Sequence, residues 1–448
     1  MGANNVLEKA ACGELRRNRI CYRRLNILHN VDSAILGVKV TRAYNVLAAD
    51  FFQMRNSRNR FLEGRENMMR RRSASVATAA MLLAMSTSPR QAASAEQAAA
   101  AVPAAPLTKF EKAPAGEAEQ IGQIISLTTQ LLQMRYPEGM ARRGVHPKDH
   151  GCVKATFTVN SDIPPNYRAG VFATPGKKYP AWIRFSNATP FLAPDLGKKG
   201  PDSRGMAIKL IGVDGDTLLN EPGAKTQDFL LINLPGFAFP NVSEYLEVTK
   251  IQLAKHDDIT SFFAPPLSPD RLKTAAVVKK IQQTNVGNPL ESPYFSAAPF
   301  LYGSDRVAKF SVTPRSAEKT PVPANPTTNY LREAMKKSLD PANGKPAVFD
   351  FKVQLRNDDS LPIEDATAEW SETTAPPQNV ATIEIDQQDF DNAFQVTECE
   401  HMAFTPWHGL TAHQPIGGIN RLRRDVYIAS SKFRSQPKEP TGFPKWPW

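Results

Sequence analysis

The sequence has few cysteines and no cysteine pattern of the metal-binding kind. Only four occur in 448 residues, and Cys12 and Cys21 fall in the first hundred. Cys152 and Cys399 remain, which are too few for a disulfide framework. No CxxC motif and no Cys/His zinc spacing is present. We therefore expect Cys152 and Cys399 to be buried free thiols.

Strong net charge is also missing from most of the chain. The total is +11. Residues 1–100 hold 16 Lys and Arg against 7 Asp and Glu, whereas the other 348 residues hold 39 against 37. This nearly neutral body argues against a nucleic-acid partner. Its composition, 41% hydrophobic and 22% charged, is that of a globular protein. The 37 prolines favour strands and turns over long helices.

Residues 1–95 have the features of a leader. Residues 68–72 are basic, residues 73–85 are apolar, and residues 93–95 form an A-x-A cleavage site, which is the pattern of a secretory signal. The apolar stretch is too short to span a bilayer, so we expect no stable membrane insertion. The pattern predicts that translation naturally starts at residue 68 or 69 and that the protein is exported to the periplasm. An Arg-rich organelle transit peptide and a disordered basic tail are the alternatives.

The rest of the chain reads as one domain after a linker. Residues 96–115 are rich in Ala and Pro and are the predicted linker, and residues 116–440 are the predicted domain. Hydrophobic periodicity predicts four helices, at 117–134, 241–255, 270–283 and 420–434. It predicts strands at 152–159, 181–186, 205–211, 229–232, 307–312, 348–355 and 380–385. This order favours an α+β fold in which helices pack outside an antiparallel β-barrel.

The last predicted helix carries Arg423, Tyr427 and Arg434. Their spacings of four and seven residues put all three within about 40° on one helix face. A guanidinium beside a phenol favours the phenolate, which is an anionic ligand for ferric iron. An Arg further along the same face can pair with a carboxylate. The pattern R-x-x-x-Y is also compatible with an exposed basic helix that carries one semi-buried Tyr.

Four other segments resemble known motifs. Residues 142–147 read R-R-G-V-H-P, residues 184–187 read R-F-S-N, residues 202–209 read D-S-R-G-M-A-I-K, and residues 403–406 read A-F-T-P. With the Tyr spacing, they resemble the haem-catalase superfamily, whose blocks are R-x-x-H, R-F-S, D-P-R-G-F-A-[IV]-K and A-F-D-P. The resemblance covers roughly residues 140–240 and 380–435. Within the superfamily, the chain resembles the small branch that includes mini-catalases, hydroperoxide peroxidases and coral allene oxide synthases.

This resemblance implies a catalase-type barrel with haem b buried between the barrel and the C-terminal helix. Tyr427 would be the iron ligand, His146 the distal acid/base, and Ser186 the partner of that His. The residues expected around the cofactor are Arg143, Val145, Arg184, Arg423 and Arg434. Arg423 would keep the Tyr ionised, and the other three arginines would bind the propionates. Catalases also have Val next to the distal His, whereas the coral synthases resemble one another in having Thr there.

One segment departs from the family pattern. Catalases carry a distal Asn just before a T-P-x-F-F-I segment, and Lys225 falls at that place before Thr226. Either Asn220 or Gln227 supplies the amide, or the distal donor is missing. The departure puts efficient dismutation of hydrogen peroxide in doubt.

The sequence thus predicts a haem-dependent catalase or peroxidase that acts on hydrogen peroxide or organic hydroperoxides. A fatty-acid hydroperoxide isomerase of the allene oxide synthase type is the first alternative. A haem- or lipid-binding barrel without turnover is the second. The expected partner is the peroxide substrate, and homo-oligomerisation is left open. His150, four residues after His146, is expected in a loop or at a strand edge, because Pro147 and Gly151 disfavour the helix of an H-E-x-x-H zinc site.

Overall fold

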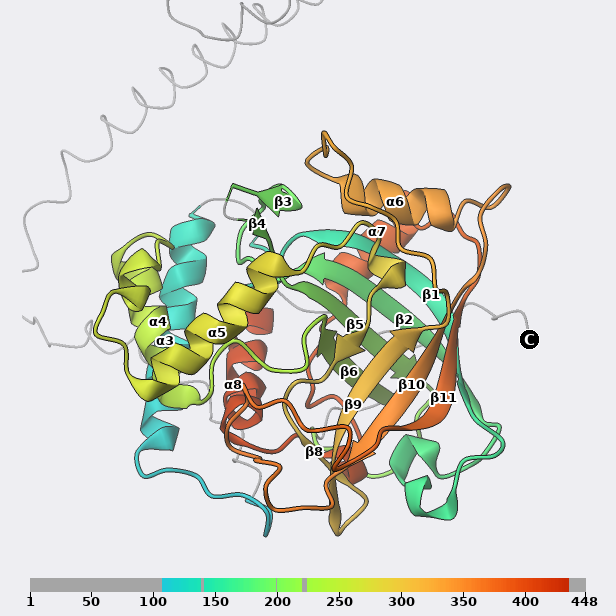
Figure 1. Cartoon of the computed structure of the whole chain (residues 1–448), viewed down its shortest axis with the longest axis horizontal. Coiled ribbons are helices and arrows are strands. Elements are labelled where there is room, and N and C mark those ends of the chain that lie inside the picture. The colour runs from blue at the N-terminus through green and yellow to red at the C-terminus, as the bar shows by residue number, and fades with distance from the viewer. Residues whose placement is uncertain (1–106, 138–140, 199, 220–223, 435–448) are drawn as a thin grey trace, which may run out of the picture. The chain divides into compact units, whose positions relative to one another are not determined.

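The computed structural model describes residues 107–137, 141–198, 200–219 and 224–434 (Figure 1). All of them belong to one compact unit, Pro103–Trp448. The predicted leader and the predicted linker up to residue 106 lie outside the described residues. Within the described part, no helix has the length and apolar character needed to cross a membrane.

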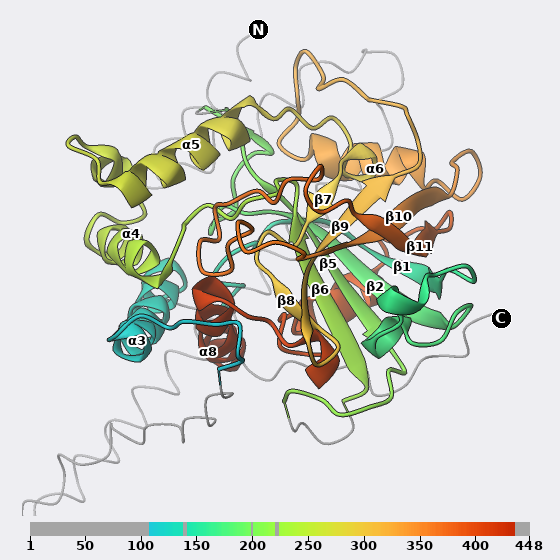
Figure 2. The same ribbon diagram turned by 60° about the horizontal axis from the view of Figure 1, so that its bottom comes forward.

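Eight antiparallel strands close into a barrel (Figures 1 and 2). β9 pairs back with β10 and completes the ring. β8 (Phe300–Tyr302) extends from β9, and β3 (Leu196–Gly197) pairs separately with β4 (Gly200–Pro201). The order around the barrel is β10 (Ala347–Leu355), β11 (Gln378–Ile385), β1 (Asp149–Val159), β2 (Lys178–Asn187), β5 (Arg204–Ile211), β6 (Thr226–Ile232), β7 (Tyr294–Phe295) and β9 (Arg306–Pro314). The predicted α+β barrel is confirmed.

Alternation along the strands separates a packed interior from a polar site outside. Phe185 on β2 is fully buried in the barrel core. Arg184 and Ser186, its neighbours in the chain, point to the opposite, outer face, because successive side chains of a strand alternate. Aromatic rings fill the interior: Phe229 has its centroid 4.9 Å from that of Phe351, which lies 5.3 Å from Phe157. The close-packed interior makes the barrel a rigid support for the residues outside it.

Helices pack around the barrel in two groups (Figures 1 and 2). α3 (Glu117–Arg135), α4 (Val242–Ala254) and α8 (Gly418–Phe433) share an apolar cluster, and α5 (Pro269–Gln283) lies on the same side. α4 begins at the cap Asn241, whose side chain accepts a hydrogen bond from the Glu244 amide. α6 (Tyr330–Ser338) and α7 (Ala393–His401) pack against β1. Every predicted helix and strand is present with ends within three residues, whereas α6, α7, β3, β4, β7 and β8 were not predicted.

Arg421 links α8 to the first described residues by hydrogen-bonded ion pairs. Its guanidinium donates to Glu117 at 2.6 Å, to Glu111 at 2.7 Å and to Glu364 at 2.9 Å. Glu111 is itself buried and accepts a hydrogen bond from the Gly417 amide. Residues 107–115, the described part of the predicted linker, therefore contact the helix that carries Tyr427.

The prediction of two free thiols is wrong. Cys152 on β1 and Cys399 on α7 form a disulfide, with Cα atoms 6.1 Å apart. That separation lies within the range that a disulfide requires. The pairing depends on α7, a short helix that the sequence did not predict, because its packing on β1 brings together two residues 247 positions apart.

Candidate functional site

His146 and Ser186 form a hydrogen-bonded pair on the outer face of the barrel. Their Nδ1 and Oγ atoms lie 2.9 Å apart. His146 precedes β1 and has a φ of 57°, which few residues other than glycine adopt. Strained backbone of this kind costs about 1–3 kcal/mol and is concentrated at functional sites. The pair leaves the other imidazole nitrogen, Nε2, available to a substrate.

Gly205 gives the imidazole room to lie flat against the sheet. It pairs with Ser186 across β2 and β5. A Cβ atom at position 205 would lie 2.7 Å from Cε1 of His146 and 2.9 Å from Oγ of Ser186, closer than Cβ atoms approach other atoms. The predicted R-G-M-A segment thus supplies the surface on which the His–Ser pair rests.

Burial keeps the ring of His146 neutral, and the positive charges around it add to this effect. Removal from water lowers the pKa of His146 to about 3, and the charges of Arg184, Arg423 and Arg143 act in the same direction. A neutral imidazole can accept a proton from a substrate at neutral pH. Val145, the preceding residue, is half-buried. The amide of Gly144 donates to Ser430 Oγ of α8 at 3.3 Å, which brings this segment against the C-terminal helix.

Three arginines gather beside this pair. Burial lowers the pKa of Arg143 to about 10 and that of Arg184 to about 9, and it also lowers the pKa of Arg434. Each of the three lies close enough to another for its charge to lower that neighbour's pKa. The carboxylate of Glu400 accepts a hydrogen bond from Arg143 at its Oε2, at 2.8 Å. Such a concentration of partly buried positive charge suits a ligand with carboxylates.

Arg184 has an unused donor in this cluster. Its side chain is 3% exposed, and its Nη2 donates at 3.4 Å to the Pro147 carbonyl. The Nε atom is buried and has no hydrogen-bond partner among the described residues. A buried donor without a partner costs about 1–3 kcal/mol, so a bound anion would stabilise this arrangement.

Arg423 and Tyr427 meet on α8, as their spacing predicts. Nε of Arg423 donates to the phenol oxygen at 3.4 Å, and the guanidinium carbon lies 5.4 Å from the ring centroid. Asn420 accepts a second hydrogen bond from Arg423 at 3.1 Å. Tyr427 is half-buried against the apolar cluster of α3, α4 and α8, which Phe237 and Tyr245 also join. The phenol therefore has apolar side chains on one side and the guanidinium of Arg423 on the other.

Lys225 lies far from this site. Thr226 pairs with Ile211 at one end of the β5–β6 hairpin, and Ile232 pairs with Gly205 at the other. At about 3.3 Å per residue, six residues separate the two ends by about 20 Å. Lys225 is exposed and pairs with Asp214 at 2.7 Å. The placement of Lys225 at the distal position is therefore wrong.

Gln227 does not provide the distal donor either. Gln227 lies at the same far end as Lys225, opposite Leu210. Its Oε1 accepts from the Leu410 amide and its Nε2 donates to the Asp228 carbonyl, so both of its polar atoms are engaged. Asn220 falls outside the described residues.

Asn233 is a buried amide at the near end of the hairpin, which sequence analysis did not single out. It follows Ile232, the residue that pairs with Gly205 beneath His146. Because successive side chains of a strand alternate, the side chain of Asn233 turns to the face opposite that of Gly205. Its Oδ1 accepts from the Arg204 amide at 2.7 Å and from Ser203 Oγ at 3.1 Å, while its Nδ2 is buried without a partner in the described chain.

The remaining histidines that the structure describes do not form a metal centre. His150 is fully buried within β1 rather than in a loop or at an edge, and its Nε2 lies 2.7 Å from Oδ1 of Asn187. His413 packs against the aromatic rings of the barrel interior. Across the described ranges, no group of three or more His, Cys, Asp or Glu residues is placed to hold a metal ion.

A closed antiparallel barrel with this site on its outer face defines a catalase-like fold. The chain is similar to the structure of a bacterial catalase, with a TM-score of 0.54 and 17% identity. It is also similar to a fungal catalase (0.54, 16%) and to catalase A from Saccharomyces cerevisiae (0.52, 15%). The matches cover 75%, 67% and 75% of this chain, and 64%, 61% and 69% of those chains. No protein-family model and no curated protein matches the sequence.

Proposed function

We propose that the protein is a haem-dependent enzyme that decomposes peroxides, as a catalase or a peroxidase. The observation that carries this proposal is the position of Arg423. It donates to the phenol of Tyr427, and its charge is close enough to His146 to lower the pKa of that imidazole. Two segments 281 positions apart in the sequence therefore share one electrostatic environment, with a phenol on one side and a neutral imidazole on the other.

The residues present fit haem b. Tyr427 would ligate the iron, because a phenolate beside a guanidinium is a stable anionic ligand. Arg143, Arg184 and Arg434 would pair with the two propionates, and the unpartnered Nε of Arg184 offers one such bond. When bound, the haem would supply a ferric iron that accepts a peroxide oxygen and provides two electrons to the breaking O–O bond.

The chain's own groups would then handle protons. Nε2 of His146 takes the proton of the bound peroxide and returns it to the leaving oxygen, while Ser186 fixes the ring orientation. Val145 and the apolar cluster around Tyr427 limit water near the reacting atoms.

An absorption spectrum of the purified protein tests the cofactor, and addition of peroxide tests the reaction. We expect a high-spin ferric spectrum of the tyrosinate type and oxygen release or reductant oxidation with peroxide. His146→Ala should keep the haem and lower turnover by roughly 10²–10⁴-fold, the contribution of a positioned acid/base. Lys225→Ala, at the exposed ion pair with Asp214, is the matched control and should leave turnover unchanged.

The products distinguish the alternatives. Conversion of a fatty-acid hydroperoxide to an allene oxide, without peroxide reduction, would favour the isomerase. A haem spectrum without any turnover would favour a binding protein, and absence of haem after reconstitution would overturn the proposal.

The proposed location is an oxidising compartment reached by export. The Cys152–Cys399 disulfide supports it, because disulfides persist in exported proteins and are rare in reducing compartments. Mass spectrometry of protein from its native host should find a mature chain that starts near Glu96. An active enzyme that retains residues 1–95 would contradict export.

A further inference from the structure

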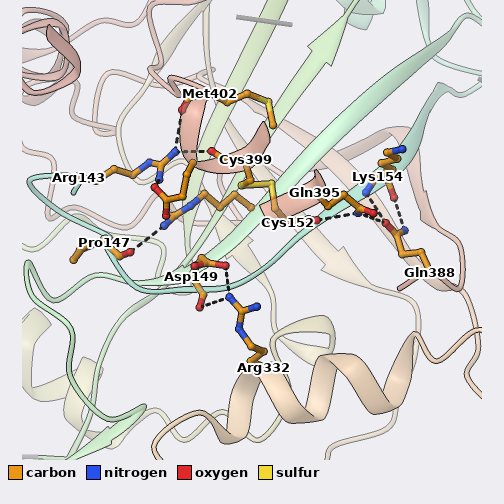
Figure 3. Close-up of a disulfide and its surroundings, with 12 residues drawn as sticks. Arg143, Pro147, Asp149, Cys152, Lys154, Arg332, Gln388, Gln395, Cys399 and Met402 are labelled. Atoms are coloured by element: carbon orange, nitrogen blue, oxygen red, sulfur yellow. Dashed lines mark hydrogen bonds and ion pairs between the residues drawn. A yellow bond between two sulfur atoms is a disulfide. The ribbon is translucent and has the colours of Figure 1, made fainter. Parts of the chain in front are cut away.

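The disulfide lies next to the arginine cluster. Cys152 and Cys399 are 3% and 4% exposed and pack in an apolar cluster with Trp182, Ile211 and Met402. Gln395 of α7 donates to the Cys152 carbonyl at 3.2 Å, so α7 is attached to β1 both covalently and by a hydrogen bond (Figure 3). The bond therefore fixes the C-terminal turn of α7 against the barrel.

Arg143 and Arg434 cap this helix end. Nη2 of Arg143 donates to the carbonyls of Cys399 and Met402, both at 2.9 Å, and Nη1 of Arg434 donates to the Glu400 carbonyl at 3.1 Å. The last carbonyls of a helix have no partner within it, and cations stabilise that end. Two of the three proposed propionate-binding arginines are thus oriented by residues 399–402.

Glu400 is the exchangeable partner in this arrangement. Its carboxylate accepts from Nη1 of Arg143, but its side chain is 36% exposed, against 11% for that arginine. The carbonyls that hold Nη2 belong to the backbone and stay in place. An incoming carboxylate can therefore replace the Glu400 side chain without disturbing the orientation of the guanidinium.

We propose that the Cys152–Cys399 disulfide positions Arg143 and Arg434 for the carboxylates of the cofactor, so that loss of the bond weakens cofactor binding. The inference rests on the proposed haem function. Without the covalent tie, the end of α7 gains freedom, and both arginines lose fixed acceptors. Immobilising a long side chain on binding costs a factor of about 2 to 10, so two arginines correspond to roughly a tenfold or larger loss of affinity.

Titration of ferric haem b into the cofactor-free full chain, followed by absorbance, tests this. Cys152→Ala/Cys399→Ala removes the bond and suits the apolar cluster around it. We expect the dissociation constant for haem to rise about tenfold. The dimethyl ester of the same haem, which lacks free carboxylates, should bind both proteins equally. A role in stability alone would weaken binding of both ligands.

Two further variants link the effect to the arginine. Arg143→Gln should already weaken haem binding, and removal of both cysteines in that background should add only the smaller part of the effect that acts through Arg434, because coupled residues are not additive. Glu400→Gln removes a competing carboxylate and should strengthen haem binding, a change opposite in sign to that of the cysteine variant. Val353→Ala, inside the barrel on β10, controls for general destabilisation and should leave both affinities unchanged.

The outcomes separate this inference from the proposed function. Equal haem affinity with and without the disulfide, or equal loss for haem and its diester, would overturn the positioning role while the haem function stands. Failure of the disulfide-bonded wild type to bind haem would overturn both. Circular dichroism and thermal unfolding of each cofactor-free variant establish that the chains compared are folded.

Discussion

Replacing Gly205 with alanine should disrupt the His146–Ser186 pair while the fold and the haem remain. The new Cβ would lie 2.7 Å from Cε1 of His146, whereas ordinary contact begins at 3.4 Å. The ring must therefore move off the sheet by about 0.7 Å. Because the same Cβ would lie 2.9 Å from Oγ of Ser186, both partners must move, and the 2.9 Å hydrogen bond between them should be lost. A displacement of this size costs about 10- to 100-fold in rate when the group must meet a reacting atom.

Stopped-flow measurement of peroxide consumption, with the rate divided by haem content, would give this factor. The haem spectrum should not change, because the atoms that a Cβ at Gly205 would meet belong to His146 and Ser186 rather than to Tyr427 or the propionate arginines. Gly122→Ala is the matched control: Gly122 lies in α3 and a Cβ there would meet nothing within 4 Å. A Gly205→Ala enzyme with wild-type kcat/KM would refute the reasoning that links the sheet surface to the imidazole position.

Two other changes test separate parts of the protein. Tyr427→Phe removes the proposed iron ligand, so the tyrosinate-type spectrum should be lost; an unchanged spectrum would exclude that assignment. Burial lowers the pKa of both His150 and His413 from 6.5 to about 4, so the unfolded chain binds more protons between these pH values. The free energy of unfolding should therefore fall as pH falls from 6.5 to 4, by about 1.4 kcal/mol per pH unit for each histidine, and urea unfolding at several pH values measures it.

The regular elements were predictable because their signals are local. Strands such as β2 and β5 alternate or run apolar between turns, and helices such as α4 begin at a capping residue. The short elements were not predictable. β7 has two residues and α7 has nine, and both are held by contacts with distant strands rather than by their own sequence. Since the pairing of Cys152 with Cys399 depends on α7, the disulfide was not predictable either.

The candidate site was predictable where motif and spacing coincide. Arg423 and Tyr427 share a helix face, and an intrahelical spacing of four residues is by itself enough to bring their side chains into contact. The pairing of His146 with Ser186 came from resemblance, since nothing local joins two residues forty positions apart. Lys225 was misplaced because the apolar run of β6 does not by itself show which of its ends lies beside His146, and only the pairing register with β5 reveals that end.

This register also removes the reason for expecting weak dismutation of hydrogen peroxide. That expectation depended on Lys225, which was aligned with the distal amide, yet Lys225 is about 20 Å along the hairpin from Gly205. Asn233 does not take its place, because Ile232 shares the face of Gly205 and the next side chain turns to the opposite face, where its Oδ1 accepts from the Arg204 amide. Steady-state kinetics with hydrogen peroxide and an alkyl hydroperoxide, measured on one preparation, therefore decide between the two proposed substrates.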